Sequence, residues 1–107
     1  MSNVKLTDGS PVPTDRSHTE IQANGQQKNY IVLSDEERSK GFVRPVRNSY
    51  KHLKCGTVTR MGTALAETYA RQPDFYTGTF CVCCRTHFPV GLDGEFVWED
   101  TDIKVGT

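Results

Sequence analysis

Apolar side chains are scattered and without a period over the first part of the chain. Residues 1–17 are rich in Pro, Ser, Asp and Gly, and the first aromatic residue is Tyr30. Such a composition buries too little apolar surface to offset the entropy lost on ordering the chain. The pattern therefore predicts a flexible arm over residues 1–29 and a folded domain over residues 30–107. Within the arm, Asn24-Gly25 fits a weak hairpin and a plain turn equally well.

Short runs of β-branched and aromatic residues follow the arm. Their composition, with turn residues between them, is typical of short antiparallel strands. An Asp-Gly pair at residues 93–94 marks a turn between two of the aromatic runs. The predicted strands cover residues 30–33, 57–59, 75–80, 87–90, 95–98 and 103–105.

One stretch has a clear helical period. Met61, Leu65 and Tyr69 recur at intervals of four residues, which places them on one face of a helix. Because Pro73 cannot continue a helix, the main helix is predicted over residues 61–72. A second, short helix is predicted after Ser34, since a Ser followed by an acidic residue three positions later forms a capping box.

The composition indicates that the hydrophobic core of the folded domain is small and needs additional stabilisation. Apolar residues make up 36% of the 107 residues, which is low for a globular chain. A domain this small usually gains stability from disulfides or from a structural metal ion. The chain is thus expected to contain one of these.

Positive charge is concentrated in one segment, although the formal net charge of the chain is zero. Residues 38–60 contain seven lysines and arginines and no acidic residue. This segment either presents a basic face to a partner or pairs with the acidic segments on both sides of it. The zero net charge excludes a general attraction of the whole molecule to nucleic acid.

Two pairs of potential metal ligands have the same spacing. His52 and Cys55 are separated by two residues, and so are Cys81 and Cys84. Two turns that each present two such side chains can enclose one tetrahedral ion, and Zn²⁺ prefers this donor set. Gly56 follows Cys55 directly and suits the left-handed backbone that such a turn requires.

The ligand set leaves one alternative open. His87 continues the spacing of the second pair and is an alternative to His52 as the fourth ligand. Cys83 breaks the two-residue spacing, so it is expected to be a free thiol. His18 lies in the predicted arm and is expected to be exposed. The fold predicted from these features is α+β: a small zinc-stapled domain with two knuckles, short antiparallel strands and one main helix.

The chain resembles zinc-ribbon and zinc-knuckle proteins over roughly residues 50–107. The resemblance rests on His52-Leu53-Lys54-Cys55-Gly56 and on Phe80-Cys81-Val82-Cys83-Cys84-Arg85. The chain departs from the usual pattern in its histidine and in the helix between the two turns. Three segments are Cys-Gly-Thr-Val-Thr-Arg-Met (55–61), Ala-Glu-Thr-Tyr-Ala-Arg (66–71) and Phe-Cys-x-x-Cys-x-x-His-Phe-Pro-Val (80–90). In these the chain also looks similar to small uncharacterised proteins of tailed bacteriophages, a likeness that implies a phage-encoded protein and no particular activity.

Enzymatic function is not expected. Four ligands close the site, whereas a catalytic zinc keeps one position for water or substrate. The signature sequences of zinc deaminases, zinc peptidases, serine hydrolases and P-loop proteins are absent. We therefore expect structural Zn²⁺ and no small-molecule substrate.

The function predicted is that of a protein–protein interaction or assembly module. The basic segment 38–60 and the aromatic hairpin 88–98 are its expected surfaces. The alternative is a nucleic-acid-binding zinc ribbon that contacts phosphates through residues 38–60. No signal peptide or membrane span is evident, so the expected location is the reducing cytoplasm, or the host cytoplasm if a phage encodes the chain.

Overall fold

Short elements of secondary structure alternate along the chain in the computed structural model, which describes residues 3–13, 15 and 17–107. All strand pairings among these residues are antiparallel, which confirms the predicted α+β class. The elements are β1 (Val4–Leu6), the 3₁₀ helix η1 (Ser17–Thr19), β2 (Ile31–Leu33), α1 (Asp35–Arg38), β3 (Ser49–His52), β4 (Val58–Arg60), α2 (Thr63–Arg71), β5 (Gly78–Cys81), β6 (Thr86–Pro89) and β7 (Phe96–Trp98).

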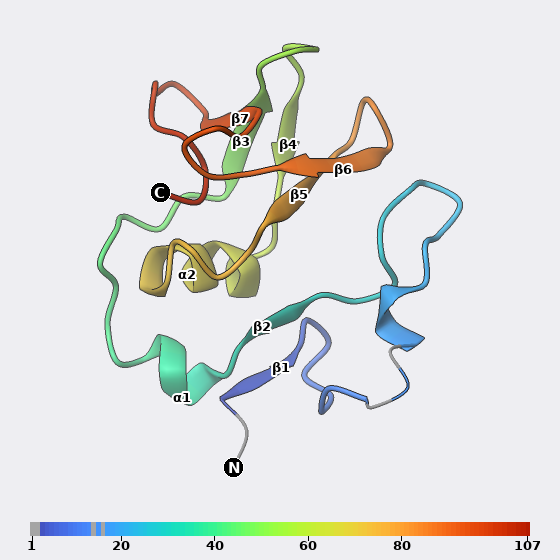
Figure 1. Cartoon of the computed structure of the whole chain (residues 1–107). Coiled ribbons are helices and arrows are strands. Elements are labelled where there is room, and N and C mark those ends of the chain that lie inside the picture. Colours follow the sequence, from blue (N-terminus) through green and yellow to red (C-terminus); the bar gives the residue numbers. More distant parts are fainter. Residues whose placement is uncertain (1–2, 14, 16) are drawn as a thin grey trace.

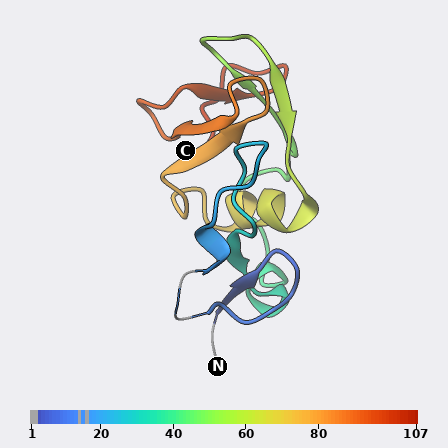
Figure 2. The same ribbon diagram turned by 90° about the vertical axis from the view of Figure 1, so that its right-hand side faces the viewer.

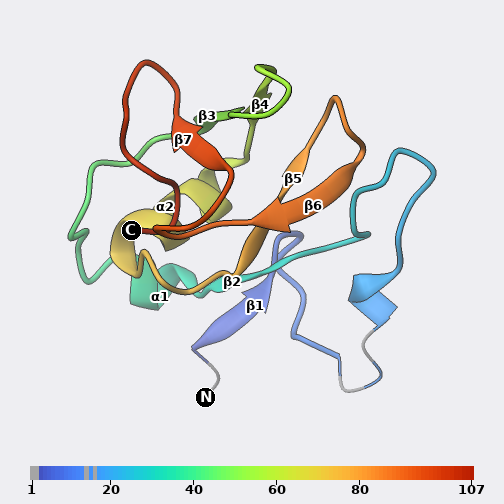
Figure 3. The same cartoon turned by 45° about the horizontal axis from the view of Figure 1, so that its top comes forward.

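Two β-hairpins lie together at one end of the molecule (Figures 1 and 2). β3 and β4 form the first hairpin, and β7 adds to the other edge of β3 to give a three-stranded sheet in the order β4-β3-β7. β5 and β6 form the second hairpin. In Figure 3 the turns of the two hairpins lie close to each other. The last predicted strand is reduced to a single bridge between Val97 and Lys104.

The main helix, α2, packs against the hairpins and contributes residues to the hydrophobic core. Its predicted apolar stripe faces inward, since Met61 and Tyr69 are buried and Leu65 is partly buried against them. The helix begins at Thr63 and ends at Arg71, just before Pro73. The core cluster is formed by Tyr50, Met61, Ala66, Tyr69, Cys81, Phe96, Trp98 and Val105. One predicted metal ligand, Cys81, therefore belongs to the core itself.

The N-terminal segment contributes a strand that the pattern did not predict. Val4–Leu6 pairs with Ile31–Leu33 to form a two-stranded sheet at the end of the molecule opposite the hairpins (Figure 2). The backbone amide of Leu33 donates to the Thr68 hydroxyl on α2, at 3.1 Å. A three-residue strand with a partner far along the chain has no local signal, so the sequence could not reveal it. The boundary between arm and domain stays a prediction.

The helix α1 follows the predicted capping pattern. The backbone amide of Glu37 donates to the hydroxyl of Ser34, which is one half of a capping box, whereas the amide of Ser34 donates to the carbonyl of Asn3 and not to Glu37. Arg38 on this helix forms an ion pair with Glu67 on α2, which ties the two helices together. The helix is only four residues long and ends before Gly41.

The segment around Asn24-Gly25 reaches the second hairpin. Ile21 and Gln27 form an antiparallel bridge, so a short hairpin is formed rather than a plain turn. Gly25 has φ +92°, and a Cβ at this position would lie 1.9 Å from the carbonyl oxygen of Arg85. Only glycine allows this contact between the arm and the second hairpin.

Two further predictions, on the exposure of His18 and on membrane spans, can be compared with the structure. The expectation that His18 is exposed is wrong, because its side chain is buried and its Nδ1 has no hydrogen-bond partner among the described residues. In the part of the chain that the structure describes, no helix has the length and apolar character needed to cross a membrane.

Candidate metal centre

The first pair of predicted ligands lies at the turn between β3 and β4. His52 ends β3, and Cys55 follows in the turn. The amide of Gly56 donates to the carbonyl of His52 at 2.7 Å, and Gly56 has φ +75°. The left-handed residue turns the chain back so that the His52 and Cys55 side chains point to the same side. The role predicted for Gly56 is therefore consistent with its backbone.

The second pair lies at the equivalent places of the turn between β5 and β6. Cys81 ends β5, and the amide of Arg85 donates to the carbonyl of Cys81 at 2.8 Å. Arg85 has φ +58°, so its backbone is left-handed like that of Gly56 in the first turn, although Arg has a Cβ. A left-handed residue other than glycine costs roughly 1–2 kcal/mol. The two turns thus have the same backbone geometry, and the second one holds it at a conformational cost.

The four donor atoms form a compact cluster. The imidazole and the three sulfurs of His52, Cys55, Cys81 and Cys84 offer donors that all lie within 4.8 Å of one another. His52 Nδ1 lies 3.3 Å from Cys55 Sγ and 3.7 Å from Cys84 Sγ, and the Sγ atoms of Cys55 and Cys81 are 3.6 Å apart. In a tetrahedron with metal–sulfur bonds of about 2.3 Å and a metal–nitrogen bond of about 2.0 Å, neighbouring donors lie roughly 3.5–3.8 Å apart. The cluster could hold a metal ion.

The surroundings of His52 fix the orientation that ligation requires. Its ring is buried and stacks on Phe88 at 4.5 Å and lies 4.8 Å from Phe96, between ring centroids. While Nδ1 faces the sulfurs, Nε2 is 2.8 Å from a carboxylate oxygen of Glu95. A carboxylate on the far nitrogen selects the tautomer that leaves Nδ1 free to bind a metal. The donor set and its support therefore fit a metal ligand rather than an ordinary core histidine.

Glu95 is placed by the backbone as well as by its charge. The amide of Leu53 in the first turn donates to the Glu95 carbonyl at 2.8 Å, which links this turn to the segment before β7. The second carboxylate oxygen of Glu95 lies 3.5 Å from Lys54 Nζ. The hydrogen bond with His52, followed by the charge of Lys54, lowers the pKa of Glu95. Glu95 is thus ionised at neutral pH.

Two of the thiols have perturbed acidities. The amide of Thr57 donates to Cys55 and, with His52, lowers the pKa of this thiol to about 6. Loss of solvation, together with the sulfurs of Cys81 and Cys55, raises the pKa of Cys84 to about 12. One thiolate is therefore available at neutral pH, while the crowding of sulfurs opposes ionisation of another. A cation between them would relieve this opposition.

The structure brings together one of the two alternative ligand sets. His87 lies outside the cluster: its Nε2 is 2.8 Å from the hydroxyl of Tyr30, and its ring packs against Phe80. Cys83 is an exposed free thiol outside the cluster. Among the described residues, the geometry thus matches the set with His52 and not the set with His87.

Sequence reasoning missed the residues that support the cluster. Glu95, Phe88 and Phe96 were predicted as parts of strands and of the aromatic hairpin, but not as residues that support the metal ligands. A buried ligating histidine needs an acceptor for its second nitrogen, and Glu95 is the first acidic residue of the strand predicted to return along the site. This need could have singled out Glu95, whereas nothing in the sequence indicates which two phenylalanines enclose the imidazole.

The two surfaces expected to carry function differ in the structure. Phe96 and Trp98 are 0% and 7% exposed, so the aromatic hairpin supplies core side chains and its expected role as a surface is wrong for these residues. The basic segment is partly neutralised: Arg38 pairs with Glu67 and Asp35, Lys40 pairs with Glu37, and Lys54 pairs with Glu95. The segment 41–48 stays at the surface, with Phe42, Val43 and Val46 exposed.

Comparison with known proteins finds no relative of this chain. No family model, curated protein or solved structure matches the chain. The resemblance to zinc ribbons therefore stays a prediction from the sequence.

Proposed function

We propose that this chain is a zinc-stapled protein-binding module. The observation that carries the zinc assignment is the closed cluster of three sulfurs and one imidazole nitrogen. This donor set in tetrahedral spacing is typical of structural zinc sites. Because four protein ligands complete the coordination, no position is left for water or substrate, and the metal holds the two hairpins together instead of catalysing a reaction. Three cysteines that bind a metal and form no disulfide suit a reducing compartment such as the cytoplasm.

The zinc assignment predicts that folding depends on the ion. Cys81 is fully buried and belongs to the core cluster, so loss of its bond to zinc would disturb the packing as well as the site. Structural zinc contributes on the order of 10–16 kcal/mol of binding free energy in finger peptides. Cys81→Ser should therefore lose the cooperative unfolding transition, whereas Cys83→Ser should keep both the transition and one zinc per chain. Equal zinc content in the two variants would contradict the assignment.

The proposed binding surface is the irregular segment 41–48. Phe42, Val43 and Val46 are 44%, 56% and 45% exposed, which places three large apolar side chains on one short segment. The amides of Val43 and Arg44 both donate to the carbonyl of Ala70, so the segment is fixed against the end of α2. Exposed apolar side chains next to Arg44 and Arg47 in the chain suit a protein partner with an apolar surface and acidic groups at its rim.

Affinity capture with matched variants tests the binding function. The double variant Phe42→Ser/Val46→Ser removes apolar surface from the segment, and Leu92→Ser removes a side chain that is 81% exposed elsewhere. Wild type and Leu92→Ser should retain the same partner from the lysate of the source organism, and the double variant should lose it. Retention of one partner by all three proteins, or by none, would contradict the proposed surface. Circular dichroism checks that each variant is folded.

Nucleic-acid binding is the second candidate function. Arg47, Lys51 and Arg60 form no ion pair with a carboxylate among the described residues, so they are free to contact phosphates. Three of the seven basic residues of the segment are paired, however, which reduces its attraction for a phosphate backbone. Binding to single-stranded DNA or RNA that weakens steeply between low and physiological salt would favour this candidate over a protein partner.

A further inference from the structure

The strand β4 has one edge without a partner, because it stands at the outside of the sheet β4-β3-β7. In its ladder with β3, the amide of His52 donates to the carbonyl of Thr57 at 3.0 Å. Since the bonds of an antiparallel ladder recur at every second residue, the backbone groups of Thr59 also face β3, and those of Val58 and Arg60 face away from it. Among the described residues, no hydrogen bond reaches these outward amides and carbonyls. They are free to pair with an added strand.

A hollow of about 520 Å³ lies beside this edge. Three successive residues of β4, Val58, Thr59 and Arg60, line it. Because side chains of successive strand residues point to opposite faces, a hollow that all three line meets the edge of the strand and not one face of the sheet. The chain therefore leaves open space where an added strand would lie.

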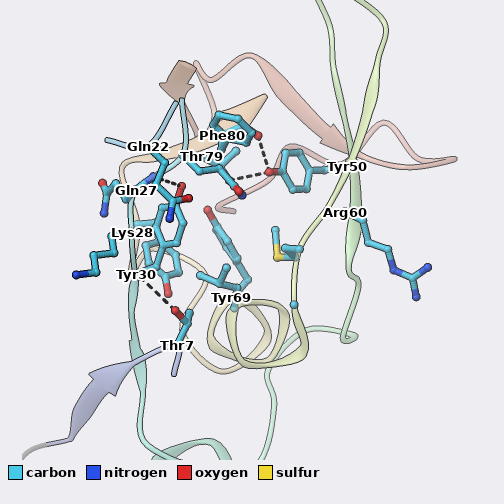
Figure 4. Close-up of a pocket in the computed structure, with 16 residues that line it drawn as sticks. Thr7, Gln22, Gln27, Lys28, Tyr30, Tyr50, Arg60, Tyr69, Thr79 and Phe80 are labelled. Atoms are coloured by element: carbon cyan, nitrogen blue, oxygen red, sulfur yellow. Dashed lines mark hydrogen bonds between the residues drawn. The ribbon is translucent and has the colours of Figure 1, made fainter. Parts of the chain in front are cut away.

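A second hollow, of about 300 Å³, continues the first beyond Arg60. The two hollows have Gln26, Arg60 and Phe80 in common, and we call them together the edge groove. Figure 4 shows the second hollow, with Arg60 on the side of β4 and Lys28 on the side of the arm. A groove that follows a strand from its first residue to the start of α2 suits an extended chain better than a compact molecule.

The charges of the edge groove are all positive. Lys28, Arg60 and Arg85 line it, and none of its lining residues is acidic. Among the described residues, none of these three cations forms an ion pair with a carboxylate. Charges beside a free edge keep most strands away from it, and here their sign favours a strand that carries an acidic residue. Pairing of β4 with β4 of a second copy is disfavoured, because it would bring the same cations of two chains together.

The edge groove also offers exposed apolar surface near the start of β4. Val58 and Val82 both line it and are 39% and 52% exposed. Val58 and Arg60 are two residues apart in the strand, so their side chains lie on the same face. An added strand therefore meets an apolar side chain and a cation on one face. It matches them if it carries an apolar residue opposite Val58 and an acidic residue opposite Arg60.

We propose that the edge groove binds an extended segment of a partner protein as an additional antiparallel strand on β4. In the direction of its own chain, the segment has an acidic residue, one residue of any type and an apolar residue. The antiparallel direction agrees with the other pairings of this sheet and gives the more stable ladder. Free amides and carbonyls in alternation complement a peptide backbone, whereas a nucleic-acid backbone has no matching row of amides. This site is separate from the metal cluster and from the segment 41–48, so its test leaves both of those proposals untouched.

Two short peptides of equal composition test the pattern. The probe is acetyl-Ser-Thr-Glu-Thr-Val-Thr-Ser-amide, and in the control peptide Glu and Val exchange places. Titration of the purified full chain, followed by ¹H–¹⁵N chemical shifts, should move the resonances of Val58 and Arg60 with a dissociation constant below about 1 mM. The exchanged peptide loses the ion pair with Arg60 and should bind about 2- to 5-fold more weakly. Equal affinity of the two peptides would overturn the proposed pattern.

N-methylation of the probe tests the backbone pairing without any change in the protein. In the proposed register, the peptide amides of Glu and Val face β4, and the amide of the Thr between them faces away. A methyl group on the Val amide removes a hydrogen bond and blocks the approach to β4, so the affinity should fall at least about 10-fold. A methyl group on the central Thr amide removes no bond and should change the affinity less than about twofold. Equal effects of the two methyl groups would contradict strand addition.

Arg60→Gln tests the charge and keeps the strand. This variant should bind the probe about 2- to 5-fold more weakly than the wild type, and it should no longer distinguish the probe from a version with Gln in place of Glu. Arg47→Gln is the control, because Arg47 also lacks an ion pair among the described residues but does not line the groove. It should bind the probe as the wild type does. Equal losses in both variants would show a general effect of charge and contradict the proposal.

Three other outcomes would overturn the proposal. The first is the absence of shifts at β4 with about 5 mM probe. The second is a shift of the same residues on simple dilution, which would assign the edge to a second copy of the chain. The third is tighter binding of single-stranded DNA or RNA than of the probe at these residues, which would assign the groove to a nucleic acid.

Discussion

Replacing Glu95 by glutamine should weaken zinc binding without unfolding the protein. Glu95 lies 2.8 Å from Nε2 of His52, on the side of the ring away from the sulfurs. Glutamine has nearly the same shape and can still accept a hydrogen bond from this nitrogen. What the substitution removes is the negative charge that makes the imidazole a stronger donor to the metal.

The expected loss is about 10-fold in zinc affinity. Substitution of residues that hydrogen-bond to metal ligands typically costs 10–100-fold, and the lower end applies here because the hydrogen bond is retained. Tenfold corresponds to about 1.4 kcal/mol. The imidazole keeps its place between Phe88 and Phe96, since this packing does not involve Glu95.

Competition with a chromophoric zinc chelator measures the affinity, and circular dichroism of the zinc-loaded variants checks the fold. Glu99→Gln is the matched control, because it makes the same change of charge at an exposed position nearby. It should change the affinity less than twofold. If Glu95→Gln and Glu99→Gln have the same effect, the carboxylate does not act through His52, and the reasoning is refuted.

Three further predictions concern the same centre. His52→Ala should lower the zinc content of the purified chain well below one per molecule, whereas His87→Ala should keep it, and the reverse result would assign the fourth ligand to His87. Phe96→Ala removes a fully buried ring that packs on the imidazole of His52. It should lower the unfolding free energy, measured by denaturant titration at fixed free zinc, by about 3–5 kcal/mol. The control Phe42→Ala, at an exposed position, should lower it by less than about 1 kcal/mol. Zinc affinity should rise with pH, by about tenfold per unit for each proton released, because the raised pKa of Cys84 means that zinc must displace a proton from it at neutral pH; a chelator competition that gives equal affinities at pH 6.5 and 7.5 would contradict this linkage.

The sequence predicted the parts of the fold that have a local signal. The stripe at Met61, Leu65 and Tyr69 placed the main helix, because a period of four residues is a property of the segment itself. The spacing of the cysteines placed the two turns, since the distance between ligands on one turn depends only on the residues within it. Ser34 marked the start of α1 for the same reason.

What the sequence did not reveal depends on contacts between distant segments. The strand at Val4–Leu6 exists only through its pairing with β2, and the burial of His18 only through the packing of the arm. Phe96 and Trp98 have the composition of an exposed hairpin as much as of a core strand, and only the addition of β7 to β3 decides between them. The folded structure was likewise needed to see which of His52 and His87 lies near the three cysteines, because both have a suitable spacing from a cysteine in the sequence.

X-ray absorption at the zinc edge tests the central claim most directly. Fine-structure analysis of the purified chain gives the number and type of atoms bound to the metal. The proposed function predicts one zinc per chain with three sulfurs at about 2.3 Å and one nitrogen at about 2.0 Å. A shell with two or fewer sulfurs, a bound water in place of a fourth protein ligand, or a chain purified without metal would contradict it.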